Sequence, residues 1–567
     1  MVLGAGAVHW RGVRRVRVVF GAGFLAFVAM SSVPMAAWAI DESEQGVERS
    51  TQYAVFVVTV LALTGAALAA RRILNGTTSA ALPFRSETAN IDLLATRPAM
   101  GNEPPIVGVF ETLFLAVLLL YALFDRAFAW VHIPGTPAFV GEITVLFGVL
   151  AMMATRAPVA TAIRKSPPLK ALLAWMGWGF LFLVVQLPAF GLDAIRDSAL
   201  WYYGIVAIFV VFLLLSDPTR FGRWADAFGR VLPFLLVWFL IAMVLDSLFG
   251  ASPPYVPDSE IPIFGHRFGN IAVLSGVAIG FIWLVDRERG RYSSTQRIIY
   301  TVLGGIGILV AGFQNRGGMV SAVLGIVAML LFLRRRRGEL ILVLASVVIT
   351  LATVAIVTEV RIPVSSGREI SAAQMIDNIN SVINPESGGE RQTETTQWRL
   401  NLWTAVVDDV TSERPLNGWG PGPNLGVRYG VSTNEEVPLR NPHNSHVGIL
   451  ARMGWVGIGL WAILWIVWSI ELLQLRSWLR HRGRSVEAGV VAWLLVTVLM
   501  ILVNAIFDPT LEGPQVGMWL WCCFGIGAAM MLVYSGVGTG VSKLIASSSG
   551  NPPAAAVDAG GGSRSAT

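Results

Sequence analysis

The fold is decided by stretches such as Ala488–Phe507, AGVVAWLLVTVLMILVNAIF, in which twenty consecutive residues include no charged side chain. An α-helix of about twenty residues is long enough to cross the hydrocarbon core of a bilayer. Comparable apolar stretches recur along the whole chain. The sequence therefore predicts an all-α polytopic transmembrane helical bundle.

We count fourteen candidate spans. Their predicted bounds are Val18–Ile40, Tyr53–Ala70, Ile106–Phe124, Phe139–Ala154, Ala171–Phe190, Ala199–Ser216, Val231–Leu248, Asn270–Val285, Ile298–Phe313, Gly317–Leu333, Leu340–Val357, Val447–Ile470, Ala488–Phe507 and Pro514–Tyr534. Several of these stretches are shorter than a full span, so we expect their helices to continue into the flanking polar residues.

The composition excludes several classes of protein. Of the 567 residues, 54% are hydrophobic and 14% are charged, whereas about 25% of residues are charged in an average soluble domain. This rules out a cytosolic enzyme, a disordered chain and a secreted disulfide scaffold. The two cysteines, Cys522 and Cys523, are adjacent within the last apolar stretch, and we interpret them as lipid-facing or packing residues rather than a disulfide framework.

The two ends of the chain have their own signatures. Four arginines, Arg11 to Arg17, precede the first apolar stretch, and Ala37-Trp38-Ala39 follows as a possible cleavage site. Residues 1–40 are therefore either a first span or a signal peptide. Residues 536–567 are rich in Gly, Ser and Ala, which predicts a disordered tail.

The distribution of basic residues predicts the orientation. When the loops are placed alternately, arginines gather on one side, as in Arg334–Arg337 and in the stretch from Arg476 to Arg484. The acidic loop Asp41–Glu44 falls on the other side. Because basic loops stay in the cytoplasm, both termini are predicted inside.

One outer loop is far longer than the others. Residues 359–442 are polar and separate the eleventh span from the twelfth, so they divide the bundle into residues 41–358 and residues 443–535. Within the loop, apolar residues follow helical spacing over Thr395–Val410, which predicts an amphipathic helix. Gly and Pro are concentrated in Arg414–Pro423, which predicts a turn-rich link.

Short outer loops each contribute about one arginine. Arg196, Arg267 and Arg316 lie in three such loops, and the loop with Arg316 is a very tight turn. Arginine stays charged and offers a planar set of donors that matches phosphate oxygens. Arginines that converge from separate loops would form an anion pocket near the outer interface. The alternative is that they are ordinary interfacial arginines, paired with nearby acids such as Asp193 and Asp197.

His443 is the candidate for acid–base chemistry. We expect Pro442 to start the twelfth helix and His443 to lie in its first turn, at the outer mouth of the bundle. A histidine there can accept a proton from a hydroxyl group near neutral pH. Two alternatives remain: His443 and His446 share a metal ion, or His443 only makes a hydrogen bond.

These residues resemble a known family. His443-Asn444, followed after nine residues by Gly454-x-x-Gly457, resembles the signature of the bacterial O-antigen ligase and polymerase superfamily. Further elements of residues 170–535 are similar to that family, namely Arg316 in a Gln-Asn-Arg-Gly turn, Trp398-Arg399 with Trp403, Pro415 with Gly418-x-Gly420, Arg196-Asp197, and Arg267 with Asn270. This chain differs in having about two additional N-terminal spans and Asn315 in place of the usual Ser.

The resemblance implies a function. Members of the family move a glycan from a polyprenyl-diphosphate carrier to an acceptor at the outer face of the bacterial cytoplasmic membrane, as inverting glycosyltransferases without metal or other cofactor. By resemblance, His443 is the base, Arg316 and Arg267 hold the diphosphate, Arg196 and Arg399 support them, and Asn444 orients the histidine or the acceptor. The partners implied are an undecaprenyl-diphosphate-linked donor, a glycan, lipid or protein acceptor, and membrane lipid, but no nucleic acid. Whether the protein is a ligase or a polymerase is left open.

Two other classes of function compete. A transporter or flippase of lipid-linked glycans would also have many spans, and it would use ionisable residues within them; here these are Glu111, Glu142 and Asp246. A metal-dependent glycosyltransferase would use paired acids, for which Asp41–Glu44 and Asp408-Asp409 are the candidates.

Overall fold

The structure is a computed structural model. It describes residues 104–535 apart from residues 134–135, 137, 156–158, 250–252, 258, 334–336, 359–361, 364–368, 371–389 and 431–439. The first two predicted spans, Val18–Ile40 and Tyr53–Ala70, and the predicted disordered tail lie outside the described residues.

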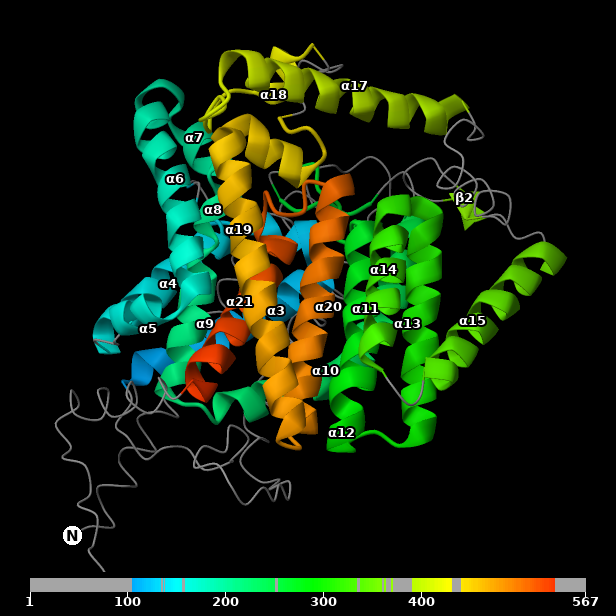
Figure 1. Cartoon of the computed structure of the whole chain (residues 1–567). Coiled ribbons are helices and arrows are strands. Elements are labelled where there is room, and N and C mark those ends of the chain that lie inside the picture. Colours follow the sequence, from blue (N-terminus) through cyan, green and yellow to red (C-terminus); the bar gives the residue numbers. More distant parts are fainter. Residues whose placement is uncertain are drawn as a thin grey trace, which may run out of the picture.

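The described residues are almost entirely helical, as predicted (Figure 1). The only strands among them, β1 (Ile362–Pro363) and β2 (Glu369–Ile370), form a two-residue antiparallel pair. The longer helices are α3 (Pro105–Ala129), α4 (Val140–Thr155), α6 (Pro167–Phe190), α9 (Ile205–Ser216), α10 (Arg220–Phe249), α11 (Phe268–Phe281), α13 (Ser294–Gln314), α14 (Arg316–Phe332), α15 (Arg337–Thr358), α17 (Glu390–Glu413), α19 (Ser445–His481), α20 (Ser485–Phe507) and α21 (Pro514–Tyr534). Short elements connect them, namely α5 (Val159–Lys165), α7 (Leu192–Asp197), α8 (Ala199–Tyr202), the π-helix Ile282–Asp286, α12 (Arg287–Arg289) and α18 (Leu425–Arg428).

Eight of the helices in the described part of the chain are long and apolar enough to cross a membrane, or up to ten if each of two bent pairs forms one span. The chain is therefore a multi-pass membrane protein by the length and composition of its helices. Each predicted span from Ile106 onward overlaps a helix. The predicted span Ala199–Ser216 is not straight, because Leu192–Tyr202 and Ile205–Ser216 meet at 45°. The total of fourteen spans and the predicted orientation stay predictions.

The centre of the bundle is formed by α11, which packs against α13, α14 and α20. Close packing depends on small residues: a Cβ atom on Gly325 of α14 would lie 2.2 Å from Cγ of Met500 on α20. Small residues let helix backbones approach closely in membranes, where no hydrophobic effect drives helices together. α21 is almost as enclosed, and its cysteines, Cys522 and Cys523, are buried packing residues.

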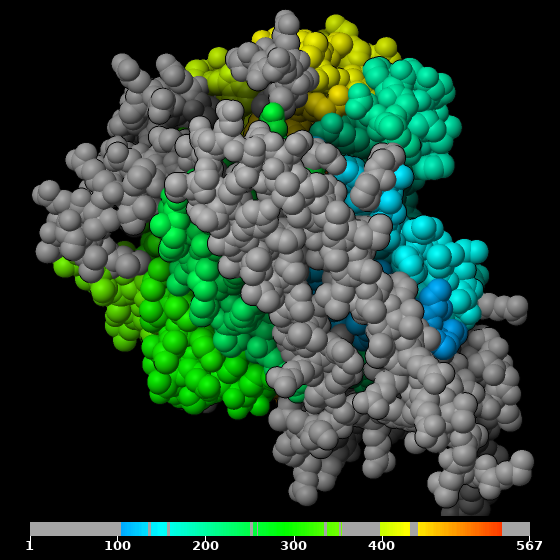
Figure 2. Space-filling model, turned by 180° about the vertical axis from the view of Figure 1, so that it is seen from behind, coloured from blue at the N-terminus to red at the C-terminus, as the bar shows by residue number. Residues whose placement is uncertain are grey.

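A second packing centre joins α6, α19 and α21 through tryptophans. Trp461 lies 4.7 Å from Trp175 and 5.3 Å from Trp465, measured between ring centroids. Seen from behind, α4 to α7 (blue to teal) form one side of the molecule and α10 to α14 (green) form the other (Figure 2).

At one end of the bundle, α17 lies across the beginning of α19 (Figure 1). The predicted amphipathic helix Thr395–Val410 is confirmed and is longer, since α17 covers Glu390–Glu413. Its buried residues Leu402, Val406 and Val410 pack with Leu450 and Ala451 of α19. We call this end of the bundle the His443 end, because His443 precedes α19 there.

Candidate functional site

His443 lies just before α19 rather than in its first turn, so this part of the prediction is wrong. The helix begins at Ser445, and the side chain of Asn444 caps it by accepting hydrogen bonds from the backbone N–H groups of His446 (2.9 Å) and Val447 (3.2 Å). Asn is a stronger N-cap than Pro or His, which explains the later start. His443 itself has φ +51°, a left-handed conformation that is uncommon outside glycine.

Arg267 approaches His443 from another loop. It caps the N-terminus of α11, and its Nη1 lies 3.3 Å from Oδ1 of Asp508, which follows α20. Its backbone N–H donates to Oδ2 of Asp125 at 2.7 Å, while Oδ1 of Asp125 accepts from Nδ2 of Asn270 at 2.9 Å. Asp125 is buried near the end of α3, where it has φ +45°. Asp125 thus fixes the turn that carries Arg267.

Arg399 and Arg316 reach the same end of the bundle. Nη1 of Arg399, on α17, donates to the backbone oxygen of Phe507 at 3.0 Å. Arg316 is the first residue of α14, and the glycines that follow it pack closely: a Cβ on Gly317 would lie 2.3 Å from Phe507, and one on Gly318 would lie 2.4 Å from Cα of Gly269. The turn with Arg316 therefore lies between the beginning of α11 and the end of α20.

Two of these arginines, Arg267 and Arg399, act electrostatically on His443, whereas Arg316 is not among the charges that shift its pKa. Burial lowers the pKa of His443 to about 4, the positive charges of Arg399, Arg267 and Arg126 act in the same direction, and Asp508 opposes them. We call His443, Arg126, Arg267, Arg399 and Asp508 the His443 cluster. Three guanidinium groups and one carboxylate act on the imidazole, which is neutral at pH 7 and able to accept a proton.

Arg196 does not join this cluster. It is exposed on α7, and its charge acts on Arg452 of α19, whereas it is not among the charges that shift the pKa of His443. Arg267 and Arg399 are therefore among the charges that act on His443, and Arg196 is not; that outer arginines form an anion pocket stays a prediction.

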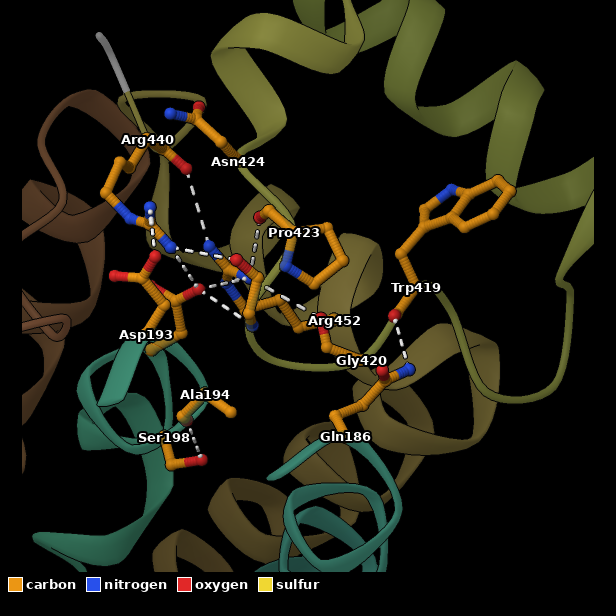
Figure 3. A network of polar contacts seen from close by, with 12 residues as sticks. Gln186, Asp193, Ala194, Ser198, Trp419, Gly420, Pro423, Asn424, Arg440 and Arg452 are labelled. Atoms are coloured by element: carbon orange, nitrogen blue, oxygen red, sulfur yellow. Dashed lines mark hydrogen bonds and ion pairs between the residues drawn. The ribbon is translucent and has the colours of Figure 1, made fainter. Parts of the chain in front are cut away.

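A second group of charges surrounds Arg452 (Figure 3). Arg452 is buried, and its Nη1 lies 2.9 Å from Oδ2 of Asp197. Arg440 contacts the same carboxylate at 3.1 Å and Oδ2 of Asp193 at 3.2 Å. We call Arg440, Arg452, Asp193 and Asp197 the Arg452 cluster; here each positive charge is matched by a negative one.

A break in α19 anchors the outer loop above this cluster. Gly454 has φ +64°, which interrupts the helix and frees the carbonyl groups before it. The backbone N–H groups of Trp419 and Gly420 donate to the carbonyls of Ala451 (2.7 Å) and Arg452 (3.1 Å). A Cβ on Gly454 would lie 2.4 Å from the carbonyl carbon of Leu416, so only glycine allows this approach.

His446 is not available as a metal ligand. Its Nδ1 accepts from Nε1 of Trp461 at 3.2 Å, and its Nε2 lies 2.9 Å from the backbone oxygen of Leu502. Both ring nitrogens are thus engaged. Among the described residues, no group of three or more His, Cys, Asp and Glu side chains could hold a metal ion.

Two of the intramembrane acids that a transporter would use are engaged in structural contacts. Oε2 of Glu111 accepts from Nε of Arg220 at 2.9 Å. Oε1 of Glu142 accepts from the hydroxyl groups of Tyr202 (2.6 Å) and Tyr203 (2.8 Å). These contacts favour no transport pathway.

Four residues near His443 are missing from the sequence-based prediction: Asp125, Arg126, Asp508 and Glu512. Asp125 and Arg126 lie within an apolar stretch that predicts only a helix. Asp508 and Glu512 lie in the six-residue link Asp508–Gly513 between α20 and α21, whose sequence DPTLEG is typical of an ordinary turn. Only the way α3 and α20 end beside α11 brings these residues to the site.

Residues 299–462 match the family model of the O-antigen ligases. The matched segment includes Arg316, Arg399 and His443, whereas Arg126, Arg267 and Asp508 lie outside it. The match confirms the resemblance to the O-antigen ligase and polymerase superfamily. Comparison with curated proteins finds no match.

Proposed function

We propose that this protein transfers a glycan from an undecaprenyl-diphosphate-linked donor to an acceptor at the outer face of the bacterial cytoplasmic membrane, with His443 as the base. The single observation that carries the proposal is the His443 cluster, in which a neutral imidazole lies among three guanidinium groups. The match of residues 299–462 to the O-antigen ligases supports glycan transfer as the reaction class.

The three arginines that act on His443 suit the leaving group of this reaction. A lipid diphosphate carries a dense negative charge that increases when its bond to the sugar breaks, and preorganised donors stabilise such charge strongly. Arg267, Arg399 and Arg316 are the residues that we assign to the diphosphate, and Arg126 joins them because its charge acts on both His443 and Arg267. The guanidinium groups then stabilise the negative charge of the diphosphate, as a metal ion does in other glycosyltransferases.

In the proposed step, the oxygen of an acceptor hydroxyl attacks the anomeric carbon from the face opposite the diphosphate. The bond from that carbon to the phosphate oxygen breaks, and its electron pair leaves with undecaprenyl diphosphate, so the configuration inverts. His443 accepts the proton of the hydroxyl group, a role that typically contributes 10²–10⁴-fold to the rate.

Donor binding also strengthens the base. Without the donor, burial lowers the pKa of His443 and the arginines act in the same direction. A bound diphosphate places negative charge among the same arginines, which raises the pKa toward its ordinary value. The imidazole thus becomes a stronger base when the donor is in place.

The ends of the bundle support an outer location for the site. α19 is 37 residues long and carries Arg480 in its last turn, so this arginine lies far from His443. Arg337 likewise begins α15, at the opposite end of α14 from Arg316. Because clustered basic residues mark the cytoplasmic side, the His443 end faces outward.

The acceptor is a glycan, a lipid or a protein, and a deletion strain distinguishes a ligase from a polymerase. Single glycan units in place of long chains indicate a polymerase, and long chains that accumulate on the carrier indicate a ligase.

The same strain tests the proposal when it is complemented with His443→Ala. We expect this variant to enter the membrane at wild-type levels and to leave the glycan defect uncorrected. An unchanged glycan profile on deletion would refute glycan transfer, and full complementation by His443→Ala would refute the base.

A further inference from the structure

Four buried polar side chains form a continuous series of hydrogen bonds at the His443 end of the bundle. Oδ1 of Asp125 accepts from Nδ2 of Asn270 at 2.9 Å. Oδ1 of Asn270 accepts in turn from Nδ2 of Asn504 at 3.2 Å, and the same Nδ2 donates to Oγ1 of Thr510 at 3.1 Å. We call Asp125, Asn270, Asn504 and Thr510 the polar chain. Each of them is no more than 3% exposed, and a buried network in which the bonds are made holds its members rigidly.

The two ends of the polar chain meet at one ion pair. At one end, Oδ2 of Asp125 accepts from the backbone N–H of Arg267 at 2.7 Å. At the other end, the backbone N–H of Thr510 donates to the backbone oxygen of Asp508 at 2.7 Å. Nη1 of Arg267 lies 3.3 Å from Oδ1 of Asp508, so the contacts close into a ring. This ring ties the end of α3 and the link after α20 to the beginning of α11.

The backbone of Asp125 is strained at the point where the polar chain begins. With φ +45° and ψ −115°, Asp125 interrupts α3. Asp125 and His443 are the two non-glycine residues with positive φ among the described residues. Residues in such conformations persist only where the surrounding structure determines them, and they gather at functional sites. The two hydrogen bonds that the carboxylate of Asp125 accepts are a determinant of this kind.

The direction of the hydrogen bonds requires a carboxylate at position 125. Both partners of the Asp125 side chain are N–H groups, so both of its oxygens have to accept. An asparagine offers one acceptor and one donor, and whichever way its amide turned, an N–H group would face another N–H group. The amide of Asn504 is oriented as well, because its Nδ2 donates to two acceptors. The carboxylate thus sets the orientation of the amides beyond it.

We propose that Asp125 is a positioning residue for the donor diphosphate: it acts through the backbone of Arg267, and the polar chain holds Arg267 and Asp508 in place before the donor arrives. This inference rests on the proposed role of Arg267. Donors fixed in advance stabilise developing charge without reorganisation, and a misplacement of about 1 Å can cost 10²-fold in rate. A buried residue that touches no substrate can therefore control the reaction.

The experiment exchanges two side chains of the polar chain. Asp125→Asn leaves one N–H group without an acceptor. The double variant Asp125→Asn with Asn270→Asp restores every bond, because the amide at position 125 accepts from the N–H of Arg267 and donates to the carboxylate at position 270. The second oxygen of that carboxylate accepts from Nδ2 of Asn504. The net charge of the double variant is that of wild type.

Two quantities are measured on the purified full-length protein: the Kd for undecaprenyl diphosphate and the rate of glycan transfer. The donor for transfer is the carrier-linked glycan extracted from the deletion strain, and membranes of that strain supply the acceptor. Values are taken per folded protein, as judged by a monodisperse size-exclusion peak. Asp408→Asn, the same change at an exposed acid of α17, is the matched control, and Arg267→Ala is run in parallel.

We expect Asp125→Asn to weaken the Kd and to slow transfer about tenfold each, with a smaller effect on the rate than Arg267→Ala, because the guanidinium is displaced but present. The double variant is expected within about threefold of wild type in both measurements, because its bonds are restored. In an Arg267→Ala background, Asp125→Asn is expected to change both values less than about twofold, because no guanidinium is left to position. Asp408→Asn is expected to stay within about twofold of wild type.

Three results would overturn the inference: wild-type affinity and rate in Asp125→Asn, a double variant no better than Asp125→Asn, or an undiminished loss from Asp125→Asn in the Arg267→Ala background. If Asp125→Asn yields no folded protein, Thr510→Val, which opens the ring at its other end, is measured in its place. It is expected to weaken the Kd at least about threefold, and an unchanged Kd would overturn the inference.

The failure of this inference is distinct from that of the proposed function. If Arg267→Ala binds undecaprenyl diphosphate weakly while Asp125→Asn binds it as wild type does, only the positioning role of Asp125 fails. If Arg267→Ala itself binds as tightly as wild type, the proposed role of Arg267 fails.

Discussion

The two arginine clusters at the His443 end differ in how their charges are matched. In the Arg452 cluster, Arg440 and Arg452 share the carboxylates of Asp193 and Asp197. In the His443 cluster, three arginines act on the imidazole against a single aspartate. A matched set of charges is complete without a ligand, whereas an excess of guanidinium groups at a helix end is stabilised by an anion. We therefore propose the His443 cluster, rather than the Arg452 cluster, as the group of arginines that binds an anion.

The largest expected effect is a loss of stability when a charge of the Arg452 cluster is removed. Arg452→Met leaves Asp197 with one partner fewer in a buried position, and breaking such a pair costs about 3–5 kcal/mol. We expect the free energy of unfolding to fall by that order, which can be measured by denaturant unfolding in detergent. Lys170→Met, at an exposed cation of α6, should change it by less than about 0.5 kcal/mol. Equal stability of Arg452→Met and wild type would mean that the cluster is not structural.

Arg267→Ala is expected to slow glycan transfer without a loss of stability, unlike Arg452→Met. Removal of one donor to a developing charge typically costs 10²–10³-fold in kcat, so we expect about 10²-fold slower transfer by a protein that still folds. Arg414→Ala, at an exposed arginine of the outer loop, is the control and should stay within about twofold. The comparison of the two clusters breaks down if Arg267→Ala transfers glycan at the control rate.

The pH dependence of kcat and kcat/KM is a further test of the His443 cluster. Burial lowers the pKa of His443 to about 4, with the arginines acting in the same direction, and only the neutral imidazole accepts a proton. kcat/KM reports the free enzyme and kcat reports the donor complex. Because the diphosphate offsets the arginines, the acidic limb of kcat is expected at a higher pH than that of kcat/KM. Coincident or reversed limbs would show that no negative charge reaches His443.

The smallest effect is expected for Arg196. Its side chain is exposed and lies with the Arg452 cluster, so Arg196→Ala should change the transfer rate less than about threefold, in the same assay as Arg267→Ala. If Arg196→Ala lowers the transfer rate as much as Arg267→Ala, Arg196 belongs to the donor site, as the sequence predicts.

The helical class and the positions of the helices that overlap the predicted stretches from Ile106 onward could be predicted from the sequence, because long apolar stretches such as Ala488–Phe507 leave few other structures open. His443 and Arg267 could be predicted as neighbours only through the family resemblance, since they are far apart in the chain. Asp125, Arg126 and Glu512 could not be predicted, because their importance depends on where α3 and α20 end relative to α11.

The start of α19 lies three residues later than predicted, at Ser445 instead of Pro442, for a local reason. Pro442 is typical of a first helical position, yet the amide of Asn444 satisfies the first N–H groups of the helix and moves its start beyond His443. This difference is what places His443 in a strained turn, and the strain is visible only in the backbone angles.

The most direct test of the account is the affinity of the purified full-length protein for undecaprenyl diphosphate, compared between wild type, Arg267→Ala and Arg196→Ala. We predict that Arg267→Ala weakens the Kd at least tenfold, about 1.4 kcal/mol, and that Arg196→Ala leaves it within about twofold. Equal affinity of Arg267→Ala and wild type would contradict the claim that the arginines beside His443 hold the diphosphate.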